Sequence, residues 1–265
     1  MERAWERGIN NTSENIFPKS LEECRSSFTV WNKNNFGHVG RKVAYLQEQL
    51  QRLECQHDAL VNMEEIQNTK MELNKMLDIE EILWKQQSRN SWLKEGDRNT
   101  SFFHTKALNR HQRNSILGVK DNNGSWQEDA DVIGKIFVDY YENLFSTSNQ
   151  TINDEMISAI HVKVSTQMNS VLINDFHAHE VERALKQMHP ITAPGPYGMP
   201  PLFYQHFWPT VGNVVIKTLL NFLNRGIIPP KFNETHIVLI PKVKNPQLVT
   251  DYRPISLCNV IYKLA

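Results

Sequence analysis

The sequence THIVLIPKVKNPQLVTDYRPISLCNVIY, residues 235–262, contains two short apolar segments separated by a polar loop. The first, Ile237–Ile240, is rich in β-branched residues and too short for a buried helix, so it predicts a strand that ends at Pro241. The second, Tyr252–Leu257, can pair back on the first. The stretch therefore predicts an antiparallel β-hairpin with a basic loop.

Two cations lie at the open end of this expected hairpin. Lys242 follows the first strand and Arg253 stands near the start of the second, so their side chains would face each other across the mouth. An ammonium and a guanidinium placed in this way suit a polyphosphate. An ordinary hairpin with solvated charges is the alternative, and the spacing alone favours that alternative.

The two strands carry a family resemblance. HIVLIPK (236–242) and DYRPISLCNVIYK (251–263) are similar to the first two sequence blocks of the fingers in reverse transcriptases of non-LTR retrotransposons, especially plant LINE-type elements. The resemblance implies that Lys242 and Arg253 are what remains of a site for the phosphates of a dNTP. It covers roughly Leu21 to the last residue.

Two motifs further upstream extend the resemblance. APGPYG (193–198) resembles the APGPDG block that precedes the fingers in that family, and Ser88-Arg89 with WLKEGDRNTSFFH (92–104) resembles its amino-terminal extension. The loop is rich in proline and glycine, so it should hold a fixed path near a ligand or another backbone. Tyr197 replaces the family's aspartate, and any contact of that carboxylate is lost here. The candidate nucleic-acid contacts in this loop are Pro194, Gly195 and Gly198.

The charges are balanced overall and segregated locally. Lys and Arg together number 29, as do Asp and Glu, so the whole chain gives no electrostatic argument for a polyanionic partner. Residues 82–120, however, hold eight cations against two acids, residues 121–181 hold two cations against ten acids, and residues from 217 onward hold seven cations against two. The pattern is basic, acidic, basic.

The first basic segment predicts a helix after Gly96, capped by Asp97 or Asn99. Its apolar side would carry Phe102, Phe103, Ala107 and Leu108. A cationic face beside aromatic residues can follow a phosphate backbone, and a solvated basic face has equal weight. The resemblance favours the first reading, because it implies that this extension lies beside an RNA or DNA template. The candidate nucleic-acid-binding residues here are Arg89, Lys94, Arg98, Lys106, Arg110 and Arg113.

Residues 39–87 are strongly helical. Apolar residues recur at three- and four-residue steps in two registers that change near residues 57–65, which indicates two helices folded into an antiparallel hairpin, with one long helix as the alternative. Such an element favours a packing or spacer role without chemistry. By contrast, residues 1–20 are polar and expected to be poorly ordered, followed by a short helix within 21–31.

The other elements follow from turn and periodicity signals. Asn123-Gly124 predicts a second β-hairpin within residues 115–126, and an amphipathic helix is expected over 129–145, with its acidic start explained by the helix dipole. Further helices are expected at 154–161, 180–188, 202–208 and 211–225, the last ended by Gly226.

These elements predict an α+β fold that is predominantly α-helical: a helical hairpin, then helices and small antiparallel β-hairpins of an incomplete polymerase right hand. We expect four segments. They are a flexible N-terminus with a short helix (1–38), a coiled-coil-like linker (39–90), the amino-terminal extension (91–175) and partial fingers without a palm (176–265).

Composition limits the compartment and the cofactors. Three widely spaced cysteines without a CxxC pair indicate a reducing environment, and the histidines lack metal-site spacing, so we expect no metal ligands. No signal peptide or membrane-spanning segment is recognisable. We expect a soluble intracellular protein, with nothing to separate nucleus from cytoplasm, and no small-molecule substrate beyond dNTP phosphates.

The catalytic residues of the resembling family are missing. Nucleotidyl transfer requires divalent ions held by carboxylates, and in that family the Mg²⁺ ligands come from the palm. The sequence contains no Asp-Asp pair and stops in the helix after the second fingers block. We therefore expect a truncated retrotransposon reverse transcriptase, without catalytic residues or a cofactor of its own, that at most binds nucleic acid or nucleotide phosphates. The alternatives are a non-catalytic nucleic-acid-binding module, a helical interaction protein and a product without a selected role.

Overall fold

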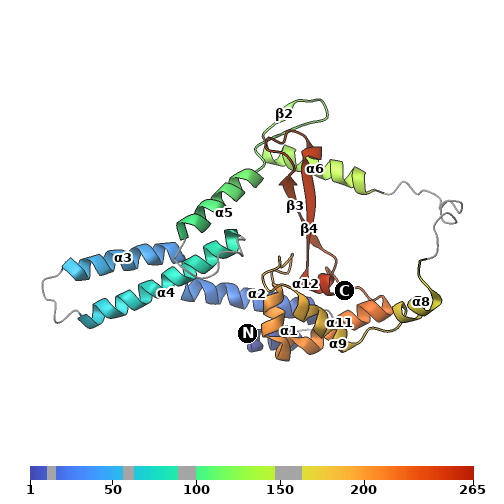
Figure 1. The fold of residues 1–265 in the computed structure, drawn as a ribbon, viewed down its shortest axis with the longest axis horizontal. Helices are drawn as coiled ribbons and strands as arrows, with labels where there is room; N and C mark the ends of the chain where they lie inside the picture. The colour runs from blue at the N-terminus through green and yellow to red at the C-terminus, as the bar shows by residue number, and fades with distance from the viewer. Residues whose placement is uncertain (11–15, 56–62, 89–99, 147–162) are drawn as a thin grey trace. The chain divides into compact units, whose positions relative to one another are not determined.

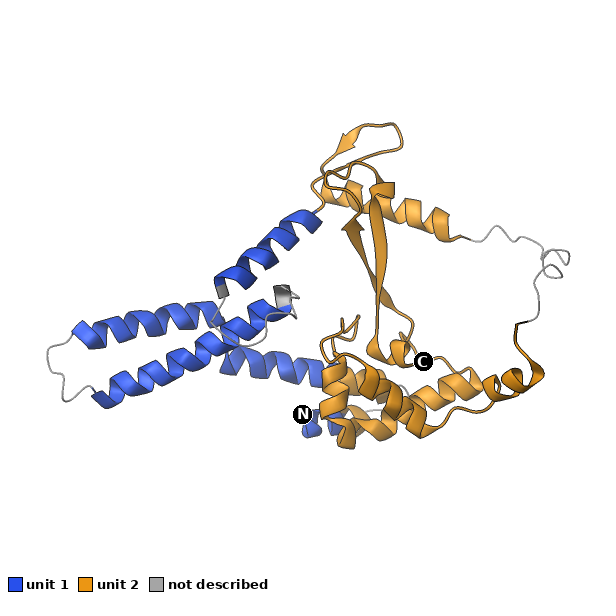
Figure 2. Ribbon diagram, in the orientation of Figure 1, with its two compact units in different colours: residues 1–7, 22–115 blue, residues 8–21, 116–265 orange. Residues whose placement is uncertain are grey.

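A computed structural model describes residues 1–10, 16–55, 63–88, 100–146 and 163–265. The fold is α+β and predominantly helical, with two small antiparallel sheets, as expected (Figure 1). The chain divides into two compact units, residues 1–7 with 22–115 and residues 8–21 with 116–265 (Figure 2). This division falls at 115/116, whereas the sequence suggested boundaries after 38, 90 and 175. The assignment of those segments to a linker, an extension and fingers stays a prediction.

The described residues near the N-terminus form two helices, where the sequence suggested one short helix within 21–31. Helix α1 spans Glu2–Asn10 and α2 spans Ile16–Asn35. Each helix needs only one apolar side to be anchored, and the overall polarity of residues 1–20 concealed that side. Both helices bury part of that side, with the buried residues being Ala4, Trp5, Phe17, Leu21 and Cys24.

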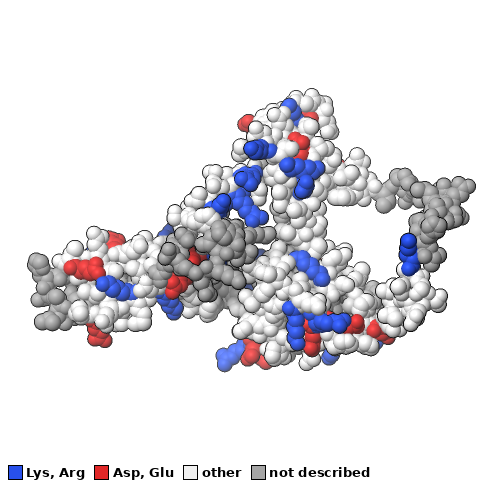
Figure 3. Space-filling model, in the orientation of Figure 1, with Lys and Arg blue, Asp and Glu red and all other residues white. Residues whose placement is uncertain are grey.

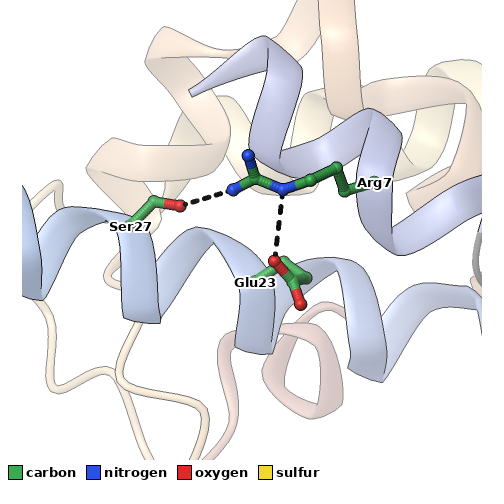
Figure 4. A network of polar contacts seen from close by, with 3 residues as sticks. All are labelled: Arg7, Glu23 and Ser27. Carbon is green, nitrogen blue, oxygen red and sulfur yellow. Dashed lines mark hydrogen bonds and ion pairs between the residues drawn. The ribbon is translucent and has the colours of Figure 1, made fainter.

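Arg7 adds polar contacts to the first unit. Its Nε lies 3.4 Å from a carboxylate oxygen of Glu23, and its guanidinium donates a hydrogen bond of 3.1 Å to the hydroxyl of Ser27 (Figure 4). Both partners belong to α2, one turn apart, so a single side chain from α1 contacts two turns of the second helix. Since these groups are exposed, the ion pair contributes at most about 1 kcal/mol.

Helices α3 (Val39–Cys55) and α4 (Met63–Ser88) form the expected antiparallel hairpin, and the alternative of one long helix was wrong (Figure 1). Val43, Leu46 and Met76 form its buried core. Ion pairs of 2.9 Å join Lys42 to Glu72 and Lys70 to Glu54.

Helix α5 (Thr100–Asn114) packs against α4. The ring of His104 meets the ring of Trp84 at a centroid distance of 4.3 Å in a T-shaped arrangement, and Phe103 is buried. The helix was expected from the sequence. Its suggested caps, Asp97 and Asn99, lie outside the described residues.

The second unit contains a short hairpin and a helix packed on it. Strands β1 (Val119–Lys120) and β2 (Trp126–Gln127) pair antiparallel, and the hairpin is shorter than residues 115–126 suggested. The indole of Trp126 lies where a side chain at Gly118 would stand, because a Cβ there would be 2.3 Å from the ring.

Helix α6 (Ala130–Phe145) confirms the amphipathic helix and its acidic start. The Asp129 carboxylate caps it by accepting hydrogen bonds from the backbone N–H groups of Asp131 and Val132. In the last turn of the helix, Leu144 and Phe145 are exposed. The core of this region consists of Val119, Ile133, Phe137, Tyr141, Val249 and Tyr252.

The remaining helices are α8 (Thr166–Leu172), α9 (Ala178–Gln187), α10 (Pro201–His206), α11 (Trp208–Arg225) and α12 (Val260–Leu264). Helix α8 was not predicted, and the helix expected at 154–161 lies outside the described residues. Gly226 ends α11 with a left-handed φ of 69°, as its position suggested.

Strands β3 (Thr235–Pro241) and β4 (Tyr252–Cys258) form the hairpin predicted from residues 235–262. They pair antiparallel, with Ile240 opposite Arg253 and Pro241 opposite Tyr252. A 3₁₀ turn, η1 (Val249–Asp251), closes the loop. Across the described ranges, no helix combines the length and apolarity that a bilayer crossing requires.

Candidate nucleic-acid interface

Helix α5 presents a cationic stripe, by which we mean Lys106, Arg110 and Arg113. Spacings of four and three residues place these side chains on one helix face, and all three are exposed. At 1.5 Å per residue the stripe is about 10 Å long. The described helix contains no acidic residue, and Figure 3 shows basic side chains gathered over it. The arrangement can contact two or three phosphates of one strand.

Phe102, which the sequence placed on the apolar side of the helix, contacts the cationic stripe as well. The ammonium of Lys106 lies 5.6 Å from the centroid of the Phe102 ring, a cation–π contact. Phe102 is half-buried, and its ring also meets that of Phe103 at a centroid distance of 5.6 Å in a T-shaped arrangement, so it lies at the border between the apolar and cationic sides. Phe103 is the buried anchor, with 2% of its surface exposed. The four-residue spacing from Phe102 to Lys106 was the signal that the sequence offered.

Three other candidate contacts, Arg89, Lys94 and Arg98, lie outside the described residues. Whether they extend the cationic stripe stays a prediction.

The hairpin brings Lys242 and Arg253 to one face. The backbone N–H of Lys242 donates to the carbonyl of Asp251 at 2.7 Å, which continues the β3–β4 ladder by one residue. Because side chains alternate along a strand and Ile240 faces Arg253, Lys242 is the diagonal neighbour of Arg253. Both side chains are exposed. The ammonium of Lys242 donates to the carbonyl of Thr250 at 2.7 Å, so one of its hydrogens is already engaged.

Asp251 lies next to these cations and was not among the predicted site residues. Its carboxylate accepts hydrogen bonds of 2.9 Å from the backbone N–H groups of Leu248 and Gln247. These bonds, with a smaller contribution from Lys242, lower the pKa of the Asp251 carboxyl. The negative charge partly offsets the two cations. The sequence did contain a signal for this role: an acid three residues after the residue that precedes a turn commonly accepts hydrogen bonds from the backbone at the start of that turn.

The Pro–Gly loop, residues 193–198, lies against the corner between β4 and α12. Gly195 has a φ of +69°, and a Cβ there would stand 2.5 Å from the carbonyl carbon and oxygen of Cys258. The ammonium of Lys263 donates to the carbonyl of Ala193 at 2.7 Å. The sequence suggested that this loop lies near a ligand or another backbone segment, and the structure shows a backbone segment beside it. Gly198 is an exposed turn residue at φ +75° and Pro194 is half-buried. Contact of the three candidate residues with nucleic acid stays a prediction.

Tyr197 is half-buried and contacts other side chains of the second unit. Its ring meets that of Phe17 at 6.1 Å in a T-shaped contact. Burial, and secondarily the negative charge of Glu234, raises the pKa of the Tyr197 phenol to about 12. A neutral phenol therefore occupies the position at which the resembling family has a carboxylate.

Asn259 organises the loop and was missed by sequence reasoning. It is fully buried, and its side-chain oxygen accepts a hydrogen bond of 2.8 Å from the backbone N–H of Tyr197. Its amide nitrogen donates to the carbonyl of Glu234 at 3.2 Å. The available signal was an asparagine placed between a strand and a helix, where such side chains commonly bind backbone groups.

Within the described parts of the chain, no group of three or more His, Cys, Asp or Glu residues is arranged to hold a metal ion.

The chain is similar to a protein encoded by a mobile element. It is 27% identical over 179 residues to the transposon TX1 uncharacterized 149 kDa protein of Xenopus laevis. The alignment covers 67% of this chain and 14% of that protein. No protein-family model matches the chain. The similarity supports a transposon-related origin for this protein.

Proposed function

We propose that this chain is a portion of a reverse transcriptase from a non-LTR, LINE-type retrotransposon, and that this portion binds RNA or DNA. The motifs at 193–198, 236–242 and 251–263 resemble that enzyme family, and the similarity to a transposon-encoded protein supports the origin. The polymerising activity belongs to the complete enzyme in this proposal.

The cationic stripe of α5 is the observation that carries nucleic-acid binding. Three exposed cations follow one helix face without an acid in that helix, and Phe102 beside Lys106 offers an aromatic surface to a base. By comparison, α3 and α4 carry mixed charges joined in ion pairs. Cations that are not neutralised locally attract phosphates most strongly.

Salt dependence and charge reversal test the binding. The affinity for a labelled single-stranded oligonucleotide should fall with rising salt, with a log–log slope of about −2 if the three stripe cations each contact a phosphate. Arg110→Glu with Arg113→Glu should weaken binding and flatten that slope. Arg41→Glu with Lys75→Glu is the matched control, because it changes the net charge equally at exposed positions on α3 and α4. A wild-type affinity independent of salt contradicts the proposal.

Primer extension tests the catalytic side. The 265 residues alone should not incorporate dNTPs with Mg²⁺ or Mn²⁺, because two-metal catalysis needs carboxylates that converge on the ions. Template-dependent incorporation by the purified chain would overturn this expectation.

A helical interaction protein is the second candidate, favoured by exposed apolar side chains on the α3–α4 hairpin. Tyr45, Met71 and Ile82 are each more than half exposed. If this surface binds a second copy, Tyr45→Ser with Met71→Ser should shift the full chain toward the monomer in sedimentation. An unchanged sedimentation coefficient removes this candidate.

A further inference from the structure

The second unit contains a cleft of about 580 Å³, lined by both polar and apolar side chains, none of which belongs to the cationic stripe. Its walls come from the β1–β2 turn, one side of α6 and the loop that contains η1. This volume lies in the range of small-ligand sites in proteins. The cleft therefore has room for a nucleotide-sized group.

The cleft is partly apolar. Ile136 and Tyr140 of α6 and Val249 of the loop line it, and Val249 is buried. Tyr140 meets the neighbouring ring of Tyr141 at 5.2 Å, edge to face, and Tyr141 belongs to the buried core. The Tyr140 ring is thus held by a contact with a buried neighbour. A supported aromatic ring beside aliphatic groups suits a flat, unsaturated ligand.

The cleft also carries hydrogen-bond donors and acceptors. Asp139 and Asn143, one helical turn apart on α6, line the cleft, and so do Asn122 and Asn123 of the β1–β2 turn. Asp121 also lines the cleft, but its carboxylate accepts bonds from Ser125, Asn123 and Gln127 inside the turn. Asp139 is therefore the exposed carboxylate best placed to accept hydrogen bonds from a ligand.

Two cations stand at the loop side. Lys120 lines the cleft, and its backbone N–H donates to the carbonyl of Gln247 at 2.8 Å. Thr250 also lines the cleft, and its carbonyl accepts the 2.7 Å hydrogen bond from the ammonium of Lys242. A negatively charged group at this side would lie near both lysines.

We propose that this cleft binds an unpaired nucleobase that carries a phosphate. The base lies on Tyr140, its hydrogen-bonding edge points to Asp139 and Asn143, and the phosphate lies toward Lys120 and Lys242. The inference rests on the proposed binding of nucleic acid and adds a site for one base. Guanine presents two N–H groups side by side, which a carboxylate accepts together, so the cleft prefers guanine to uracil.

The experiment compares three short RNAs of about eight nucleotides, identical except for a central guanine, uracil or abasic position, by fluorescence anisotropy with the full chain. The guanine RNA should bind most tightly and the abasic RNA least. Tyr140→Leu should weaken guanine binding at least about fivefold, the lower range for loss of base stacking. Asp139→Asn should abolish the preference for guanine over uracil while keeping the uracil affinity.

The control variant is Glu142→Gln, which removes a carboxylate of the same helix that lines a different, apolar groove. It should leave the order of the three RNAs unchanged. Tyr140 also packs against the core, so a folding defect in Tyr140→Leu is checked by circular dichroism. Asp139→Asn changes an exposed side chain and should not affect folding. The test therefore remains decisive even if the Tyr140→Leu protein unfolds.

The outcomes separate this inference from the proposed function. Equal affinities for the guanine and abasic RNAs overturn the proposal that the cleft binds a base. This holds even if Arg110→Glu with Arg113→Glu weakens the binding of all three RNAs. If no RNA binds, the proposed function fails. Calorimetry with guanosine monophosphate then decides whether the cleft binds a nucleotide. Binding of that nucleotide, lost in Asp139→Asn, identifies a free nucleotide as the ligand, and absence of binding overturns the site.

Discussion

The buried side chain of Asn259 accepts a hydrogen bond of 2.8 Å from the backbone N–H of Tyr197, which joins two segments 62 residues apart in sequence. The same side chain donates to the carbonyl of Glu234 at 3.2 Å. One amide thus ties the Pro–Gly loop and the approach to β3 to the corner where β4 ends.

We expect Asn259→Ala to lower the free energy of unfolding by about 2 kcal/mol, because it empties a buried position and removes the side-chain partner of two part-buried backbone groups, the N–H of Tyr197 and the carbonyl of Glu234. Urea denaturation measures the change. Asn213→Ala, an exposed asparagine of α11, is the matched control and should change stability by less than about 0.5 kcal/mol. Equal effects of the two substitutions would show that the Asn259 contacts are not stabilising.

Gly195→Ala should destabilise the fold by about 2 kcal/mol or more, since φ is +69° and the added Cβ would collide with the carbonyl of Cys258. Gly134→Ala is the opposite case. It lies inside α6 with open space around its Cα, so the substitution should stabilise by about 0.5–1 kcal/mol. Thermal unfolding of both variants checks the pair, and a stabilised Gly195→Ala protein contradicts the close approach described above.

The apolar face of the β3–β4 hairpin should drive weak self-association. Val238 and Ile255 are directly opposite each other, and each is 40% exposed. Val238→Thr with Ile255→Thr keeps strand propensity and should reduce concentration-dependent association in sedimentation. Val243→Thr, at a residue of the loop that is 50% exposed, serves as the control. Unaltered association in the double variant would rule out this face as its source.

Stability should fall in acid partly through Asp251. The hydrogen bonds to its carboxylate lower its folded-state pKa below the usual 3.8, so this stabilisation is complete above pH 3.8 and is lost as the pH falls through the lowered pKa. Asp251→Asn should therefore reduce the acid sensitivity of the urea midpoint between about pH 5 and about pH 2. A wild-type slope retained in this variant would assign the acid sensitivity to other groups.

The cysteines should differ in reactivity. Cys24 is buried, and burial raises the pKa of its thiol to about 11, so only about a thousandth of it is thiolate at about pH 8. Cys55 is exposed. Alkylation followed by mass spectrometry should label Cys55 in the native protein and Cys24 only after unfolding. Rapid native labelling of Cys24 would contradict its burial.

Local patterns predicted most of the regular structure. The periodic apolar residues of α6 and α11, the stop at Gly226 and the strand ended by Pro241 each depend on residues close in sequence. Such signals survive in one sequence because a helix face or a strand terminator acts over a few residues. The cationic stripe of α5 followed from the same periodicity.

Contacts between segments that are distant in the sequence could not be predicted. The burial of Trp5 depends on tertiary packing, so a polar N-terminus concealed two helices. Likewise, the meeting of Gly195 with Cys258 follows from tertiary packing and leaves no periodic trace. The cleft between the β1–β2 turn, α6 and the η1 loop is also lined by residues from three separate elements. None of these elements indicates a binding site by its own sequence.

The bond from Lys263 to the carbonyl of Ala193 limits how this region can be divided experimentally. A fragment designed around the β3–β4 hairpin that begins after residue 198 would discard the loop on which the end of β4 rests, and one that stops before Lys263 would release that loop from the other side. Excision is therefore safe only outside residues 193–263, and deletion mapping or tag insertion should treat this span as a single indivisible block.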